Sequence, residues 1–439
     1  MNDALTLLKR GGVVGGGGAG FPTWKKLEGQ VPRLLVNAAE CEPLLKSDQY
    51  LMLTQADELI RGARLLQGIC GANELLIALK AHYVPQIAAL EAAIARAGTP
   101  VALVKMPTVY PAGDEQEVVY AATGEAIRPL SLPSSVGCVV VSVSTAINAA
   151  RALDGIPVTR RLVTVAGEVA RPGLYDVPVG MSVAAVVRSA GGATVPGARL
   201  MLGGPMMGTP VKPDADPVVA KTCGGILVLA PEHTLIRRAE QPLHQMKNRA
   251  KAACIQCRMC TDMCPRYLLG QPLAPHRVMR AFAMGQLEPA ALLCVECGIC
   301  EWYACPMGLS PRRVQAQMKP QLREQGAAPD RGSYPAQRAM HAYRQVPSAR
   351  LMARLDVRRY DMPVPEHVTV LSADEVRVPL KQHIGAPCVP CVGVGDRVEA
   401  GQAVGRMADG ALGADVHAPI GGVVVAVGAE VAIRGRDKA

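Results

Sequence analysis

Eight of the fourteen cysteines in this 439-residue chain lie in two matching runs between residues 254 and 305. In each run three cysteines are two residues apart, and a fourth stands directly before a proline. Three thiolates at this spacing can bind three irons of one cubane, and the Cys-Pro ending is typical of iron–sulfur proteins. The duplicated run therefore predicts two [4Fe–4S] clusters.

The fourth cysteine of each run is expected to bind the cluster of the other run, as in two-cluster ferredoxins. One predicted ligand set is Cys254, Cys257, Cys260 and Cys305. The second set is Cys294, Cys297, Cys300 and Cys264. The second run has four residues, Glu301 to Ala304, before its last cysteine where three is the rule, so Cys305 departs from the pattern.

Zinc sites and disulfides are the two alternatives to clusters. Zinc favours spaced pairs of ligands, often with histidine, rather than triplets that end in Cys-Pro. Disulfides need an oxidising compartment, and the chain has no basic-then-apolar leader that would indicate export. The chain also has no apolar run long enough to span a bilayer. We therefore expect a cytoplasmic protein without direct membrane insertion.

The length predicts three or four domains, and the formal charge of +10 suggests an acidic partner. Much of the basic excess lies between Arg237 and Arg359, around the cysteine runs. Compensation of the anionic clusters explains it better than nucleic-acid binding, because aromatic residues for base stacking are missing. No nucleic-acid partner is predicted.

A glycine-rich segment near the N-terminus covers residues 11–26 and contains Phe21 and Trp24, although the chain has only two Phe and two Trp. Glycines let backbone N–H groups approach a phosphate or a flat ring, and Lys26 adds a positive charge. No apolar strand precedes the loop, so it is not the dinucleotide fingerprint. A flexible linker is the alternative.

Alternating strands and helices follow and predict a mostly parallel, helix-covered sheet. The first strand, Leu34–Val36, leads into Asn37–Pro43, whose polar side chains would lie at the ligand-binding edge of such a sheet or cap the next helix. The expected helices are 48–68, 84–97 and 145–153, and the further strands are 74–79, 101–104 and 137–143.

These segments resemble the FMN- and NADH-site motifs of the complex I flavin-subunit family. The resemblance rests on Gly15 to Lys26, Asn37 to Pro43 and the Gly113-Asp114-Glu115 turn, in that order before two cluster runs. It implies that FMN and NADH are cofactors. By resemblance, the FMN contacts are Gly15, Gly17, Gly18, Gly20, Lys26 and Asn37, and the turn residues Gly113, Asp114 and Glu115 with Phe21 lie on the NADH side, with Glu42 near the nicotinamide.

Two positions depart from the family pattern. Ala39 stands where the complex I protein has an acidic residue. The flavin segment that contains two asparagines in that family is here Ser142 to Thr145, so only Thr145 is carried over as a cofactor contact.

The remaining chain predicts three further units. Residues 161–229 alternate short strands with one helix, resembling the soluble-ligand-binding β-grasp (SLBB) domain, which suggests either cobalamin binding or a structural spacer. Residues from 362 resemble a lipoyl-type barrel-sandwich hybrid, but Gln402–Pro419 lacks the lysine that a swinging arm needs. Cys388 and Cys391 are either a redox pair or inert, and we favour inert.

The predicted fold is therefore multidomain α/β. The domains are expected at 1–160 (FMN/NADH-binding α/β), 161–235 (β-grasp), 240–325 (helical two-cluster unit), 326–361 (linker) and 362–439 (barrel-sandwich hybrid).

Two related families share flavin, β-grasp and twin-cluster motifs. In the Rnf C family the barrel lies at the N-terminus, whereas in the cobalamin reductases of propanediol-utilisation microcompartments it follows the clusters, as it does here. The resemblance to the second family implies an NADH-dependent oxidoreductase acting on cobalamin, with an adenosyltransferase and microcompartment shell proteins as partners. An Rnf C-type component of a membrane complex and a non-enzymatic electron-transfer scaffold are the alternatives.

Overall fold

Four parallel strands form the sheet of the N-terminal domain in the computed structural model, which describes residues 2–332 and 336–435. The strand order is β3-β2-β1-β5, and each neighbouring pair is parallel. The carboxyl ends of the four strands therefore meet at one edge of the sheet. Their bounds are β1 Arg33–Asn37, β2 Glu74–Lys80, β3 Ala102–Met106 and β5 Cys138–Ser142.

Helices cover both faces of this sheet because alternate strand residues point to opposite sides. Leu34 and Val36 pack with α1, α3, α4, α5 and α7, whereas Leu35 packs on the other face with α6. The helices are α1 Asn2–Arg10, α2 Thr23–Lys26, α3 Ser47–Thr54, α4 Ala56–Ile69, α5 Val84–Ala97, α6 Glu115–Thr123, η1 Pro133–Val136 and α7 Val143–Leu153.

The single helix expected over residues 48–68 is wrong, because the structure divides it into α3 and α4 at Gln55. The backbone of Gln55 leaves the helical region, with φ of −133° and ψ of 32°. Its side-chain oxygen accepts a hydrogen bond from Arg151 of α7 at 2.8 Å. Apolar spacing continues through the break, so the sequence pattern does not reveal it.

A six-stranded sheet in the order β12-β7-β6-β10-β8-β9 forms the β-grasp domain. Strands β6 and β10 are parallel, and the pairs β6–β7, β8–β10 and β8–β9 are antiparallel. The edge strand β12 comes from the segment before the C-terminal barrel. The elements are β6 Arg160–Gly167, β7 Gly173–Pro178, α8 Val183–Ser189, β8 Arg199–Leu202, β9 Thr209–Pro210, β10 Gly225–Leu229 and β12 Thr369–Val370.

Short helices carry the two cysteine runs around a small core that includes Met246, Val278 and Val314. Helix α13 packs against both α10 and α14. The elements are α9 Thr234–Ala239, α10 Leu243–Ala253, α11 Met259–Asp262, α12 Pro265–Leu268, α13 Pro275–Met284, η2 Pro289–Leu293, η3 Ile299–Ala304 and α14 Pro311–Glu324.

Two small antiparallel sheets enclose the core of the C-terminal barrel, in the orders β13-β19-β18-β15 and β14-β16-β17. Its strands are β13 Glu375–Pro379, β14 Val389–Pro390, β15 Arg397–Val398, β16 Ala403–Arg406, β17 Val416–His417, β18 Gly422–Val427 and β19 Glu430–Gly435.

The segment between the cysteine-rich unit and the barrel returns to the N-terminal domain. Strand β11 (Val346–Pro347) pairs with β4 (Val109–Tyr110) and is followed by α15 (Ser348–Arg354) and η4 (Arg358–Tyr360). Its apolar residues, including Leu351, are buried in a core shared with η3 and β10.

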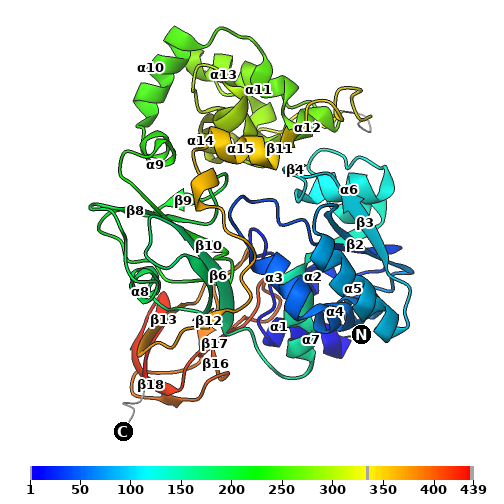
Figure 1. The fold of residues 1–439 in the computed structure, drawn as a ribbon, viewed down its shortest axis with the longest axis vertical. Coiled ribbons are helices and arrows are strands. Elements are labelled where there is room, and N and C mark those ends of the chain that lie inside the picture. Colours follow the sequence, from blue (N-terminus) through cyan, green and yellow to red (C-terminus); the bar gives the residue numbers. More distant parts are fainter. Residues whose placement is uncertain (1, 333–335, 436–439) are drawn as a thin grey trace.

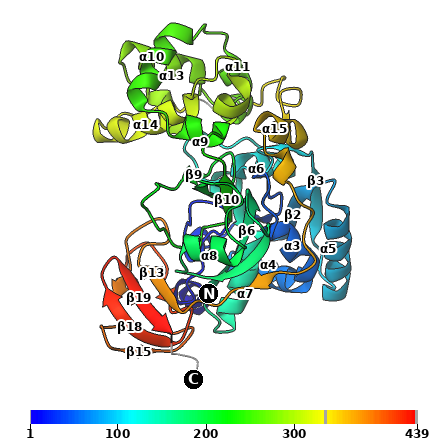
Figure 2. The same ribbon diagram turned by 60° about the vertical axis from the view of Figure 1, so that its left-hand side comes forward.

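The cysteine-rich helices sit at one end of the molecule and the barrel at the other, with the N-terminal and β-grasp domains between them (Figures 1 and 2). The mixed multidomain α/β fold agrees with the sequence prediction. Within the described residues no helix is long and apolar enough to cross a membrane.

Candidate functional site

The glycine-rich loop lies between α1 and α2 and is closed by a hydrogen bond from Gly15 N to the Phe21 carbonyl at 2.9 Å. The Gly16 amide donates to Thr145 Oγ1 at 3.1 Å. A Cβ atom on Gly16 would lie 2.6 Å from Ser144 Oγ and 2.8 Å from Arg161 Nη1, so a larger residue would require these side chains to move. A Cβ on Gly18 would meet nothing within 4 Å, so the middle of the loop is open.

The polar residues at the ends of β1 and β5 lie beside this loop. Asn37 and Ser142 are register partners at the carboxyl ends of their strands. Ser142 Oγ lies 2.8 Å from Thr145 Oγ1, which in turn holds the Gly16 amide. The structure thus brings the predicted contacts Asn37 and Thr145 to the edge of the sheet where α/β folds bind ligands.

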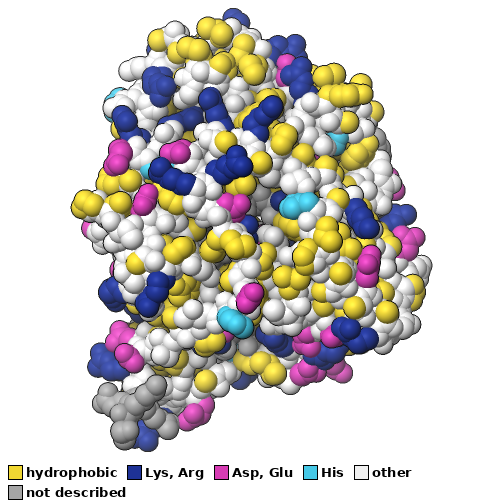
Figure 3. Space-filling view, in the orientation of Figure 1, with side chains coloured by type: hydrophobic (Ala, Val, Ile, Leu, Met, Phe, Trp, Pro, Cys, Tyr) yellow, Lys and Arg dark blue, Asp and Glu magenta, His cyan; other side chains and the backbone are white. Residues whose placement is uncertain are grey.

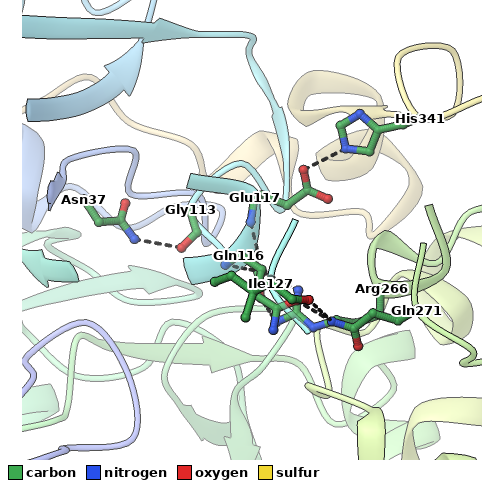
Figure 4. Close-up of polar contacts among 9 residues, drawn as sticks. Asn37, Gly113, Gln116, Glu117, Ile127, Arg266, Gln271 and His341 are labelled. Carbon is green, nitrogen blue, oxygen red and sulfur yellow. Dashed lines mark hydrogen bonds and ion pairs between the residues drawn. The ribbon is translucent and has the colours of Figure 1, made fainter. Parts of the chain in front are cut away.

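The residues predicted for the FMN and NADH sides meet through two polar contacts. Lys26 Nζ donates to Glu115 Oε1 at 2.8 Å and to the Val140 carbonyl at 3.1 Å. Asn37 Nδ2 donates to the Gly113 carbonyl at 2.8 Å (Figure 4). The Gly113–Glu115 turn is therefore anchored to the β1 edge and to α2.

Glu42 binds the β-grasp domain. Its Oε1 accepts hydrogen bonds from Met206 N at 2.6 Å and Met207 N at 3.2 Å. Burial raises the pKa of this carboxyl to about 7. A Cβ on Gly204 would lie 2.0 Å from Glu42 Cγ, so any larger residue there would displace the Glu42 side chain. The Gly203–Gly208 turn is therefore held against the Asn37–Pro43 segment.

Cys264 of the first run lies with Cys294, Cys297 and Cys300 of the second run, and these four cysteines line one small cavity. Burial and the neighbouring thiols of Cys305, Cys254, Cys257 and Cys264 raise the pKa of Cys260 to about 12. We call Cys254, Cys257, Cys260 and Cys305 the distal set, and Cys264, Cys294, Cys297 and Cys300 the proximal set.

Each set supplies four thiols, the donors that one [4Fe–4S] cubane takes. A structural zinc ion also takes four sulfurs, each about 2.3 Å from one metal. A cubane binds each thiolate through a different iron, which holds the sulfurs farther apart. N–H groups already point at Cys254, Cys294 and Cys305 sulfurs at 3.1–3.3 Å.

The extra residue before Cys305 is accommodated by a turn of π-helix, η3. A π turn absorbs one inserted residue and is common at functional sites. Glu301 in this turn is fully buried, and its carboxylate accepts a hydrogen bond from Arg312 at 3.2 Å. The four-residue spacing thus leaves Cys305 beside the distal set.

The proximal set lies against the N-terminal domain. Tyr110 Oη donates to the Cys297 carbonyl at 2.6 Å. Arg266, two residues after Cys264, forms two hydrogen bonds with Asp114 at 2.6 and 2.9 Å. Asp114 also caps α6 by accepting hydrogen bonds from the Gln116 and Glu117 amides. Cys257 of the distal set, in contrast, is exposed.

Two basic residues that contact the glycine-rich loop had no signal in the sequence motifs. Arg161 donates to the Gly16 carbonyl at 2.6 Å and to Ser144 Oγ at 3.2 Å. Lys221 Nζ donates to the Gly12 carbonyl at 2.8 Å and to the Asp415 carbonyl at 2.9 Å. A buried cation in an otherwise apolar segment is the only hint that either residue gives.

The C-terminal barrel also forms hydrogen bonds with the glycine-rich loop and the start of α2. Ile384 N donates to the Gly20 carbonyl at 3.1 Å, and Trp24 Nε1 donates to the Gly413 carbonyl at 2.7 Å. Nearby, Cys388 is buried against Met407, whereas Cys391 is exposed, and both are free thiols. This contact gives a structural role to a barrel whose Gln402–Pro419 segment has no lysine to carry a prosthetic group.

A Lys221→Met variant tests this support through its pH dependence. Burial lowers the pKa of Lys221 from 10.5 to about 8. Lys221 therefore binds its proton more tightly in the unfolded chain than in the folded one. Because of this difference, the free energy of unfolding rises by about 3 kcal/mol between about pH 8 and pH 10.5.

In Lys221→Met we expect that rise to disappear from urea-unfolding curves measured from pH 7 to 10.5. The nearby Cys388, Asp415, His383 and His417 remain in both proteins, so the comparison isolates the lysine. Lys212→Met, at an exposed site, is the control. A constant difference between wild type and Lys221→Met across this range would contradict the assignment.

Basic side chains gather over the cysteine-rich helices in the space-filling view (Figure 3). Arg238 lies over the Trp302 ring at 4.5 Å and donates to the Glu301 and Leu309 carbonyls. Lys319 donates to the Cys294 carbonyl at 2.8 Å. Positive charge at these positions offsets the negative charge of thiolate-bound clusters.

Comparisons with protein-family models assign a module to each part of the chain. The Nuo51 FMN-binding domain matches residues 8–151 and the SLBB domain matches 162–210. The 4Fe-4S dicluster domain matches 253–310, and the RnfC barrel sandwich hybrid domain matches 366–438. These modules and the site geometry define an oxidoreductase with FMN and two [4Fe–4S] clusters as cofactors.

Full-length relatives identify the family. The chain is 46% identical over 426 residues to "Cobalamin reductase PduS" of Salmonella typhimurium, covering 96% of this chain and 93% of that protein. It is 45% identical to the Citrobacter freundii protein of the same name, covering 97% of this chain and 95% of that protein. The chain belongs to the family of the cobalamin reductases PduS.

Two more distant similarities cover parts of the chain. The C component of the ion-translocating oxidoreductase complex of Erwinia tasmaniensis is 36% identical, over 62% of this chain and 33% of that protein. A solved structure of an NAD⁺-reducing [NiFe]-hydrogenase in the H₂-reduced state is similar in fold, with a TM-score of 0.50 and 23% identity. It covers 74% of this chain and 62% of that one.

Proposed function

We propose that this chain uses NADH to reduce cobalamin, from cob(III)alamin through cob(II)alamin to cob(I)alamin. One observation supports it above the others: polar contacts run without a break from the Asn37 edge through the Gly113–Asp114 turn to Arg266 beside the proximal cysteines. The name of the relatives that are 46% and 45% identical indicates the acceptor.

When bound, FMN would supply hydride chemistry with NADH, and the clusters would supply single-electron transfer. The chain supplies position and charge. Backbone amides at Gly15, Gly17, Gly18 and Gly20 can approach the FMN phosphate and ring closely. Lys26 forms an ion pair with Glu115 in this structure, and its ammonium group can rotate towards the FMN phosphate.

On the NADH side we assign Phe21, Glu115 and the Gly113–Asp114 backbone. Phe21 is half-buried at the end of the glycine-rich loop. Glu42 lies behind this region, and its hydrogen bonds to Met206 and Met207 suit it to hold the β-grasp turn against the site. The eight cysteines of the proximal and distal sets would bind the two clusters.

The position of each cysteine set suggests the order of electron flow. The proximal set is joined to the N-terminal domain by the Tyr110–Cys297 and Asp114–Arg266 contacts. The distal set includes the exposed Cys257 and adjoins Ile255, which is 67% exposed. We infer that electrons from the flavin reach the proximal set first.

The finer biological assignments are also proposals. We expect an adenosyltransferase to take the cob(I)alamin product, and microcompartment shell proteins to be neighbours in a cytoplasmic microcompartment. The support for the compartment is the family membership.

The test is anaerobic reconstitution of the clusters, addition of FMN, and measurement of NADH-driven bleaching with and without aquacobalamin. We expect bleaching by NADH, and reoxidation when cobalamin is added, with formation of cob(II)alamin and then cob(I)alamin in its absorption spectrum. A protein denatured before reconstitution is the control.

Each alternative gives a different result in this test. Bleaching with transfer to a dye but not to cobalamin would favour an Rnf C-type electron-transfer protein. Clusters without any NADH-driven bleaching would favour a non-enzymatic scaffold. Either result would reject the proposed activity.

A further inference from the structure

Three soft donor atoms meet inside the C-terminal barrel, apart from the flavin and cluster residues. Cys388 Sγ lies 3.5 Å from Met407 Sδ and 3.9 Å from His383 Nε2. All three residues are buried, with exposed fractions of 4% for Cys388, 8% for Met407 and 6% for His383. A thiol, a thioether and an imidazole therefore face one another where water has little access.

A glycine brings the imidazole close to the thioether. A Cβ atom on Gly413 would lie 2.4 Å from His383 Cε1 and also 2.4 Å from Met407 Sδ. Two atoms this near to one point are near to each other, and Cε1 is bonded to Nε2. All three pairs of donors are therefore close, and no side chain separates them at Gly413.

The separations are those of ligands around one metal ion. With metal–sulfur bonds of about 2.3 Å and metal–nitrogen bonds of about 2.0 Å, neighbouring donors of a three- or four-coordinate ion lie about 3.6–4.0 Å apart. The two measured separations, 3.5 and 3.9 Å, agree with this range. The donors thus need little movement to share one ion.

The imidazole also lacks the hydrogen bonding that a buried polar group usually has. Within the described part of the chain, His383 Nδ1 has no hydrogen-bond partner. A sulfur atom is a weak partner for Nε2. Such an unsatisfied buried group requires an explanation, and a bound ion is one.

We propose that Cys388, Met407 and His383 bind one soft monovalent ion, Cu(I). This inference does not depend on the proposed function. Thiolate and thioether sulfurs favour Cu(I), and imidazole also binds copper. On binding, the S–H bond of Cys388 breaks and a sulfur–copper bond forms, and the proton passes to the solvent. No electron is transferred.

The charge of the site favours a monovalent ion over Zn²⁺. Burial raises the pKa of Cys388 to about 11, and the Lys221 ammonium opposes this effect. Cu(I) with one thiolate is neutral, whereas Zn²⁺ would leave a net positive charge near that buried ammonium, which is costly. In residues 2–332 and 336–435 no three His, Cys, Asp or Glu side chains converge, so the third donor here is the thioether.

An ion at this position would join two segments that contact the glycine-rich loop. The residue after His383 donates its amide to the Gly20 carbonyl at 3.1 Å. The segment from Met407 leads to Gly413, whose carbonyl accepts a hydrogen bond from Trp24 at 2.7 Å. The ion would therefore hold the barrel in the shape that contacts the loop.

The test is copper binding by the full, cluster-loaded chain under anaerobic conditions, with Cu(I) supplied from a bicinchoninate buffer. The variants are Cys388→Ala and Met407→Leu, the second of which nearly keeps the side-chain volume. Cys391→Ala is the matched control, because Cys391 is an exposed thiol of the same barrel. We expect one Cu(I) per wild-type chain, loss of copper in Cys388→Ala, at least tenfold weaker binding in Met407→Leu, and no change in Cys391→Ala.

Iron content and NADH-driven bleaching are measured on every protein, and if Cys388→Ala loses iron, Met407→Leu decides the outcome. X-ray absorption at the copper edge should show both sulfur and nitrogen ligands. Copper that enters only as iron leaves, ligation by sulfur alone, or wild-type affinity in Met407→Leu would overturn the inference. Loss of copper in Cys391→Ala, or a wild type that binds no Cu(I), would do the same.

Discussion

A Cys264→Ser variant is expected to purify with about four irons per chain instead of about eight, and to lose cobalamin reduction. The reason is that Cys264 comes from the first run but lies with Cys294, Cys297 and Cys300 of the second, all four lining one cavity. Serine is a poor ligand for iron in this role, so the proximal cluster should be lost while the distal one assembles.

The measurements are iron and sulfide content, and the electron paramagnetic resonance spectrum of the dithionite-reduced protein. NADH-driven bleaching of the flavin should persist, since the flavin site is intact. Cys305→Ser is the mirror variant and should remove the distal cluster instead. Cys223→Ser, at a cysteine outside both sets, is the control and should keep about eight irons.

A further variant, Cys254→Ser, tests whether the fourth cysteines are exchanged between the two clusters, by comparison with Cys264→Ser. If Cys264→Ser and Cys254→Ser removed the same spectral signal, each run would bind its own cluster. The crossed arrangement would then be wrong, although the protein would still hold two clusters.

The clusters and the parallel sheet could be predicted from sequence because their signals are local. The spacing of Cys254, Cys257 and Cys260 is set within seven residues, and a cubane accepts few other patterns. In the same way, β1 ends directly at Asn37, and strand order in α/β folds places such residues at a shared edge.

Contacts between domains could not be predicted, because no periodicity links the partners. Arg161 reaches Gly16 from 145 positions away, and Lys221 reaches Gly12 from 209. The hydrogen bonds of Glu42 to the Met206–Met207 turn are of the same kind. Each is a polar group buried by a second domain, and one sequence gives no sign of which surfaces will meet.

The break at Gln55 and the π turn at η3 were missed for a different reason. Both are local, but they change the backbone by a single residue within an otherwise helical pattern. The four-residue gap before Cys305 is visible in the sequence, where it departs from the usual spacing of three residues. The structure explains the departure, because the π turn accommodates the extra residue. Spacing rules assume regular backbone, and functional sites often depart from it.

One buried ion pair lies at the contact between the N-terminal domain and the proximal cysteines, and its loss should have a large effect. Arg266 is 4% exposed, and both of its terminal nitrogens bind the Asp114 carboxylate, whose side chain is 13% exposed. Removal of one partner of a buried pair leaves an uncompensated charge and costs about 3–5 kcal/mol.

We therefore expect Arg266→Met to lower the free energy of unfolding in urea by about 3–5 kcal/mol. Arg96→Met is the matched control, because Arg96 also binds one carboxylate, Asp57, through two nitrogens, but at the surface. That pair is 59% and 68% exposed, so its loss should cost about 1 kcal/mol or less.

A double-mutant cycle separates the pair from its surroundings. In Asp114→Asn the amide oxygen can still cap α6, so the variant tests charge rather than the cap. We expect the double variant Arg266→Met with Asp114→Asn to be less destabilised than the sum of the two single variants, because neither charge is then left unpaired.

Transfer from the reduced flavin to the clusters, followed by stopped-flow absorbance, should slow in Arg266→Met and stay unchanged in Arg96→Met. Equal destabilisation in the buried and exposed variants, with additive effects in the cycle, would show that this pair does not join the flavin domain to the proximal cysteines.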